Sequence, residues 1–101
     1  GHIMSTARIL QRTQKGEGID LLIEHQADTK PYILEKGYVA VDGMSLTVGE
    51  VQSEGFNLHI IPETLRITTI GAKTEGDLVN IEVDSRTQAV VDTIRSMEVQ
   101  R

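Results

Sequence analysis

An Asp-Gly dipeptide joins two short runs of alternating apolar and polar residues near the middle of the chain. Asp42 and Gly43 separate Tyr38–Val41 from Ser45–Val48. Both turn residues tolerate the positive φ angles of a type I′ turn, so Asp-Gly in this setting is the strongest short-range signal for a β-hairpin. The same period of two recurs along most of the chain, and it predicts an all-β fold.

Further alternating runs lie on both sides of this hairpin, and turns that contain glycine separate several of them. They predict about six strands, and the seven candidate segments are Ile3–Gln11, Ile19–His25, Tyr38–Val41, Ser45–Val48, Phe56–Ile61, Leu65–Ile70 and Leu78–Val83. Short, closely spaced strands favour closure over an open sheet with unpaired edges. We therefore expect an all-β chain, folded as a small closed six-stranded Greek-key-like β-barrel.

One short helix is predicted between the second and third of these runs. Asp28 and Thr29 are capping residues, and Pro31 suits the first turn of a helix. We expect this helix to end near Leu34.

A second helix is predicted at the carboxyl end of the chain, where Asp84 or Ser85 can cap its first turn. Apolar residues then recur at helical spacing, at Val90, Ile94 and Met97. This stripe could pack on the barrel itself or on a neighbouring subunit. We expect residues 1–84 to form the barrel and residues 85–101 the helix.

Composition argues against several classes of protein. The formal net charge is -5 and the chain has three aromatic residues, whereas nucleic-acid binding needs clustered cations and stacking rings. The absence of cysteine excludes disulfides and thiolate metal sites and fits a cytoplasmic protein. No apolar run approaches the roughly 20 residues that span a bilayer, so we expect no membrane partner. His2, His25 and His59 are scattered, so we expect no metal site.

Alternation also assigns the faces of the strand after the hairpin turn. Met44, Leu46 and Val48 share one face, and Ser45 and Thr47 share the other. The apolar set must fill the interior, because small barrels are packed with side chains. Any ligand site is therefore expected on the outer wall, covered by a second surface. The pattern alone favours the simpler interpretation that Ser45 and Thr47 are ordinary solvent-facing strand residues.

Five segments in order resemble riboflavin synthase of the alpha-chain type. They are Gly1–Met4, Tyr32–Gly37, Val41–Val48, Ile60–Leu65, and Gly76-Asp77 with Val79–Asp84. Chains of that family hold two similar barrels in tandem, and the first typically carries Asn-Gly-Cys where this chain has Asp-Gly-Met-Ser. The chain thus resembles the C-terminal lumazine-binding repeat. The resemblance also favours Gly1 and His2 as native residues, where composition alone allows a cloning scar.

The resemblance implies a function and its partners. In the family, two molecules of 6,7-dimethyl-8-ribityllumazine exchange a four-carbon unit, which gives riboflavin and 5-amino-6-ribitylamino-uracil without a metal or organic cofactor. Each active site forms between the first barrel of one subunit and the second barrel of another, in a homotrimer held by C-terminal helices. The alternative is a noncatalytic lumazine- or flavin-binding antenna protein with the same barrel.

Roles for individual residues follow from the same resemblance. The residues implied in catalysis are His2, Ser45 and Asp84. The residues implied in substrate binding are Gly1, Met4, Lys36, Ser45, Thr47, Ile61, Pro62, Glu63 and Thr64. A single barrel supplies only half of such a site, so we expect the 101-residue chain to bind the ligand with poor or absent turnover. Pairing of two copies as a homodimer is one way to imitate the missing half.

Overall fold

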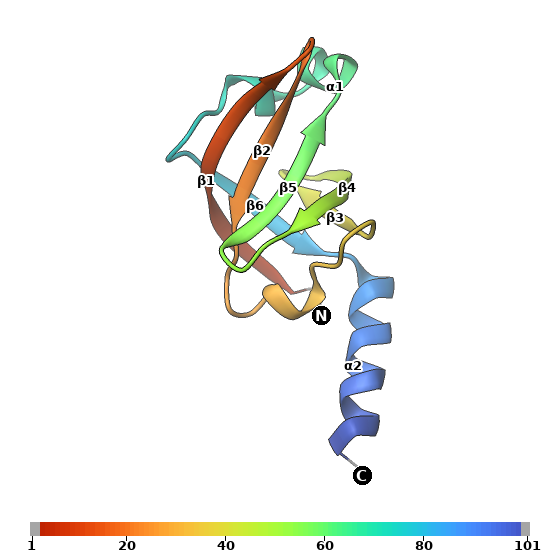
Figure 1. Cartoon of the computed structure of the whole chain (residues 1–101). Coiled ribbons are helices and arrows are strands. Elements are labelled where there is room, and N and C mark those ends of the chain that lie inside the picture. Colours follow the sequence, from red (N-terminus) through yellow and green to blue (C-terminus); the bar gives the residue numbers. More distant parts are fainter. Residues whose placement is uncertain (1–2, 100–101) are drawn as a thin grey trace.

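The structure is a computed structural model that describes residues 3–99. Over these residues it is a closed barrel of six antiparallel strands with a C-terminal helix (Figure 1). The strands are β1 (Met4–Lys15), β2 (Gly18–Glu24), β3 (Tyr38–Val41), β4 (Met44–Val51), β5 (Gly55–Ile60) and β6 (Leu78–Val83). Their order around the barrel is β1-β2-β5-β4-β3-β6, because the β3–β4 hairpin inserts between β5 and β6. The predicted Greek-key-like barrel is confirmed.

The hairpin turn between β3 and β4 has the conformation that its sequence predicts. Asp42 has φ 48° and Gly43 has φ 85°, which are the left-handed angles of a type I′ turn. Val41 pairs with Met44 across the turn, and Ala40 pairs with Ser45 one step further on. Since side chains alternate along a strand, this register fixes Ser45 on the outer wall.

The barrel interior is filled by aliphatic side chains and one phenylalanine. The core consists of Ala7, Ile9, Ile19, Leu21, Ile23, Ile33, Val39, Val41, Val48, Phe56, Leu58, Ile60, Ile70, Val79 and Ile81. Val48 is buried while Ser45 and Thr47 are exposed, so the predicted faces of β4 are confirmed. Because the interior is packed in this way, a ligand can bind only on the outside.

The predicted strand Leu65–Ile70 is wrong. This segment belongs to helix α1 (Pro62–Ile67) and the 3-10 helix η2 (Thr69–Ala72). Pro62 at the first helical turn presets φ, and Glu63 favours the amino-terminal end of a helix. These local signals outweigh the apolar alternation.

The short helix predicted near residues 28–34 is present but is only one turn of 3-10 helix, η1 (Lys30–Tyr32). Thr29 lies at its amino-terminal end without a side-chain capping bond, and Pro31 lies in the first turn as expected. The turn buries Tyr32, whose side chain lies 7% exposed at one end of the barrel.

The C-terminal helix α2 (Ser85–Val99) extends away from the barrel (Figure 1). The Tyr32 hydroxyl donates a 2.6 Å hydrogen bond to Asp92 Oδ1 and ties the helix to η1. The three residues of the apolar stripe, Val90, Ile94 and Met97, are each more than half exposed, so the stripe does not pack on its own barrel. Within residues 3–99, no helix combines the length and hydropathy needed to cross a membrane.

Candidate functional site on the outer barrel wall

Strand register places four outward residues in one row across four strands. Met4 of β1 pairs with Glu82 of β6, Glu82 pairs with Ala40 of β3, and Ala40 pairs with Ser45 of β4. Directly paired residues share a face, so this row runs along the outer wall. Tyr38 and Thr47 form the next paired row toward α2.

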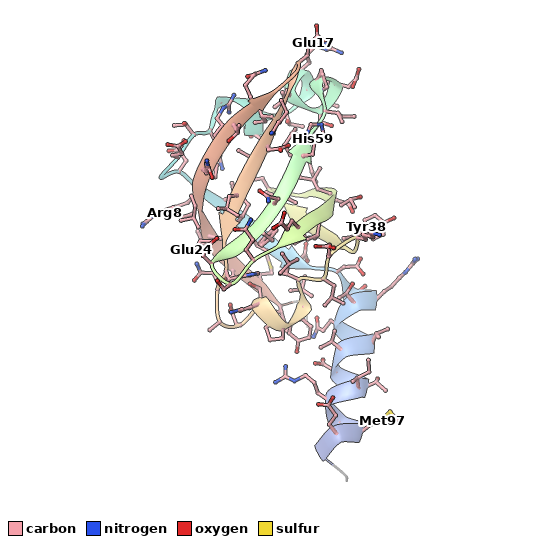
Figure 2. All side chains as sticks on the ribbon, viewed as in Figure 1. Arg8, Glu17, Glu24, Tyr38, His59 and Met97 are labelled. Carbon is pink, nitrogen blue, oxygen red and sulfur yellow. The ribbon has the colours of Figure 1, made fainter. Side chains whose placement is uncertain are left out.

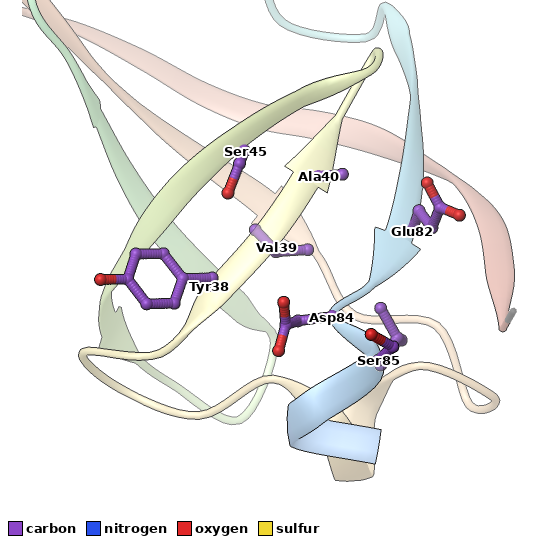
Figure 3. A pocket seen from close by; sticks show the side chains of 8 residues that line it. Tyr38, Val39, Ala40, Ser45, Glu82, Asp84 and Ser85 are labelled. Carbon is purple, nitrogen blue, oxygen red and sulfur yellow. The ribbon is translucent and has the colours of Figure 1, made fainter. Parts of the chain in front are cut away.

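A hollow of about 200 Å³ opens on this wall beside the start of α2 (Figure 3). Its lining includes Tyr38, Ala40, Ser45, Glu82 and Asp84. A second hollow of about 320 Å³ shares Tyr38 and Asp84 with the first and reaches Val90 on α2. Ligand pockets usually measure roughly 300–1,000 Å³ and enclose most of the ligand. An open hollow of this size needs a covering surface to enclose a ring system.

Asp84 has a structural role at the edge of this hollow. Its Oδ2 accepts hydrogen bonds from the Thr87 backbone N–H at 3.0 Å and from the Thr87 hydroxyl at 3.3 Å. These bonds make Asp84 the N-terminal cap of α2, as the sequence allows. Within the described part of the chain, Oδ1 has no hydrogen-bond donor, so one carboxylate oxygen remains available to a ligand.

The hairpin that carries Ser45 is held in place through Asp42. Asp42 Oδ1 accepts a 2.8 Å bond from the Asn80 N–H, and Lys73 Nζ donates a 2.6 Å bond to Oδ2. Lys73 Nζ also donates to the Leu78 carbonyl oxygen at 2.8 Å. This network joins the turn to β6 and to the loop after η2. The sequence pattern marks Asp42 only as a turn residue and gives no signal for Lys73.

Lys36 lies next to the site, and its backbone adopts an unusual conformation. Its φ is 69°, and its N–H donates a 2.9 Å bond to the Val48 carbonyl oxygen. The Val48 N–H donates in turn to the Gly37 carbonyl oxygen at 2.8 Å. This pairing places Lys36 beside the strand that carries Thr47, and its side chain is exposed.

The other residues predicted for the site are not among the described residues that line this hollow. Ile61–Thr64 lie at the start of α1, toward the end of the barrel opposite α2 (Figure 1), and do not line the hollow that Ser45 and Asp84 share. Met4 lies in the outward row but lines a neighbouring hollow. Gly1 and His2 lie outside the described residues. The structure therefore brings Ser45 and Asp84 together, with Lys36 and Thr47 nearby.

The two described histidines lie away from this hollow. His25 packs against Phe56 and donates its Nε2–H to the Gln52 carbonyl oxygen at 2.9 Å, and burial lowers its pKa below the ordinary value. His59 Nδ1 donates a 2.6 Å bond to Asp20 Oδ1, a contact that sequence spacing did not indicate. Within residues 3–99, no group of three or more histidine, aspartate or glutamate side chains could hold a metal ion.

These features define a small closed β-barrel with a shallow hollow on its outer wall, lined in part by the polar residues Ser45, Glu82 and Asp84. The lumazine binding domain family matches residues 1–84. The chain belongs to this family, and the predicted membership is confirmed.

Known relatives carry the name riboflavin synthase. The protein from Escherichia coli strain K12 is 47% identical over 95 residues, which cover 93% of this chain and 45% of the relative. The protein from Chlamydia pneumoniae is 40% identical over 95 residues, which cover 94% of this chain and 46% of the relative. The chain thus spans about half the length of the relatives that it matches.

Proposed function

We propose that this chain binds the lumazine ring system on its outer wall and forms one half of a riboflavin synthase active site. The observation that carries the proposal is the shared hollow of Ser45 and Asp84 on a barrel of the lumazine binding domain family. Since the interior is packed, the ligand must lie outside. The Ser45 and Thr47 hydroxyls supply donors and acceptors there for a heterocycle or a polyol chain.

The proposed reaction is the transfer of a four-carbon unit between two molecules of 6,7-dimethyl-8-ribityllumazine. The 7-methyl group of the substrate is already acidic, so a protein has mainly to orient two rings and to move protons. Such a reaction needs no metal or organic cofactor. In this proposal Asp84 Oδ1 receives a ribityl hydroxyl or positions the reacting groups, Lys36 borders the site, and backbone groups of Ile61–Thr64 add further contacts.

A second barrel completes the site in this proposal. The hollow is open and about 200 Å³ in volume, so one wall cannot bury a ligand of this size. The second barrel comes from another copy or another chain, and the exposed stripe of α2 supplies the contact between subunits of the full-length trimer. The 101-residue chain then binds the ligand but produces riboflavin slowly or not at all, in a cytoplasmic setting.

Titration of the purified chain with 6,7-dimethyl-8-ribityllumazine tests the binding proposal. Ligand fluorescence should change in a saturable way, and riboflavin should not accumulate over hours. Sedimentation of the same sample determines whether two barrels associate. Fluorescence that does not saturate contradicts the proposed site. Rapid riboflavin formation by a monomer contradicts the proposal of half a site. Binding that stays unproductive after a first-repeat barrel is added points to the noncatalytic alternative.

A further inference from the structure

The three aromatic side chains of the chain have very different surroundings. Tyr32 and Phe56 are buried at 7% and 1% exposure, whereas Tyr38 is 56% exposed. Phe56 packs against His25, but the Tyr38 ring has no aromatic partner and its hydroxyl has no hydrogen bond within residues 3–99. A large amphipathic ring on an outer strand therefore lacks any partner in the described part of this chain.

Tyr38 occupies the centre of the candidate site. It pairs with Thr47 across the hairpin and lines both of the hollows that contain Asp84. Figure 2 shows its side chain projecting outward, and Figure 3 shows it beside Ser45 and Asp84. The polar groups Ser45 and Asp84 thus share a hollow with an exposed aromatic ring.

A flat conjugated ligand needs this combination of groups. Its edges carry hydrogen-bonding atoms, which hydroxyls such as those of Ser45 and Thr47 can meet, but its faces are apolar and polarisable. Aromatic side chains stack on such faces, and each stacked base contributes a factor of roughly 5 to 150 in nucleic-acid complexes. Leu34 and Val90, which are exposed beside Tyr38 in the second hollow, extend the apolar surface.

We propose that Tyr38 is a binding residue whose ring lies against the face of the ligand's fused ring system. The inference rests on the proposed function, because it assumes that a lumazine occupies the outer wall. It assigns recognition of the ring face to Tyr38 and recognition of the ring edge to the hydroxyls of β4. Since the contact is made by the ring and not by the hydroxyl, phenylalanine should replace tyrosine at this position.

The experiment compares Tyr38→Leu and Tyr38→Phe with the unchanged chain. Two probes are titrated, namely 6,7-dimethyl-8-ribityllumazine and 6,7-dimethyllumazine, which lacks the ribityl chain. Tyr38→Leu should weaken both probes by the same factor of about ten, and Tyr38→Phe should stay within about twofold. Leu78→Ala is the matched control, because Leu78 is 53% exposed on β6 and lies outside both hollows.

Each remaining outcome separates this inference from the proposed function. If Tyr38→Leu binds both probes normally while Ser45→Ala weakens them, the Tyr38 contact is wrong and the outer-wall site stands. A loss restricted to the ribityl probe also overturns a contact with the ring. If Tyr38→Leu lowers only the sedimentation mass, Tyr38 belongs to a subunit contact. If the unchanged chain binds neither probe, the proposed function fails together with the inference.

Discussion

Two walls of the barrel carry polar side chains, but these side chains interact differently. On the wall formed by β1, β2 and β5, Thr13 pairs with Asp20 and Asp20 with His59. Asp20 and His59 bind each other there at 2.6 Å. On the wall formed by β6, β3 and β4, the hydroxyls of Ser45 and Thr47 have no hydrogen bond to the described part of the chain. Figure 2 labels His59 on the first of these walls and Tyr38 on the second.

The difference shows why a hollow alone does not identify a site. The β1–β2–β5 wall also has a hollow, of about 290 Å³, beside Asp20 and Asn57. There the Asp20 carboxylate already has a partner in His59, so a ligand that bound Asp20 would have to displace this contact at a cost. On the other wall the anchoring bonds of Asp42 lie beside the hydroxyls and leave them accessible. Variants matched between the walls can test this distinction.

Removing an aspartate should have the largest effect, and the effect should differ between the walls. Asp42→Ala removes the acceptors of the Asn80 N–H and of Lys73, so we expect a loss of about 3 kcal/mol in the free energy of unfolding. Asp20→Ala removes an exposed pair, for which less than about 1 kcal/mol is expected. Urea unfolding of both variants measures the difference. Equal losses would show that Asp42 does not anchor the hairpin.

Paired hydroxyl substitutions should have the next largest effect, on ligand binding. Ser45→Ala with Thr47→Ala removes two neutral hydrogen-bonding groups, so affinity for 6,7-dimethyl-8-ribityllumazine should fall by about 2 kcal/mol, or roughly thirtyfold. Gln11→Ala with Thr13→Ala makes the same spacing of changes beside the hollow of the other wall. Fluorescence titration should show normal affinity for this control. Unchanged affinity in the first pair would disprove the assignment of the site.

Features that depend only on residues close together in the sequence were predictable. The Asp42-Gly43 turn and the outward direction of Ser45 follow from alternation and turn chemistry, and the cap at Asp84 follows from its place before a helical pattern. The helix α1 was missed because its residues also alternate. Its signal was Pro62, whose fixed φ suits a first helical turn.

Features that depend on barrel closure were not predictable. The Lys73–Asp42 bond joins residues 31 positions apart, and the His59–Asp20 bond joins residues 39 positions apart. Alternation tells which face a residue occupies but not which strands become neighbours. The exposed ring of Tyr38 beside the hollow also becomes visible only when β3, β4 and β6 are placed together.

The contact between the barrel and α2 should respond to a smaller change, Tyr32→Phe. The hydrogen bond to Asp92 raises the pKa of Tyr32 above its ordinary value of 10.0. A raised pKa means that this bond stabilises the fold below pH 10 and that the stabilisation is lost as pH rises further. The protection of the α2 amides, measured relative to the intrinsic exchange rate at each pH, should therefore fall in Tyr32→Phe at neutral pH and in the unchanged chain above pH 10. Protection that is equal in both chains at neutral pH would contradict this anchoring role.

The smallest effect is expected for Glu63→Gln at the start of α1. Glu63 forms an exposed 3.4 Å pair with Arg66, and exposed pairs contribute little to stability. Our proposal assigns ligand contacts in this segment to backbone groups, which the substitution keeps. Affinity for 6,7-dimethyl-8-ribityllumazine should thus stay within about twofold. A tenfold loss would mean that the Glu63 carboxylate itself contacts the ligand and that backbone groups are not the only contacts in this segment.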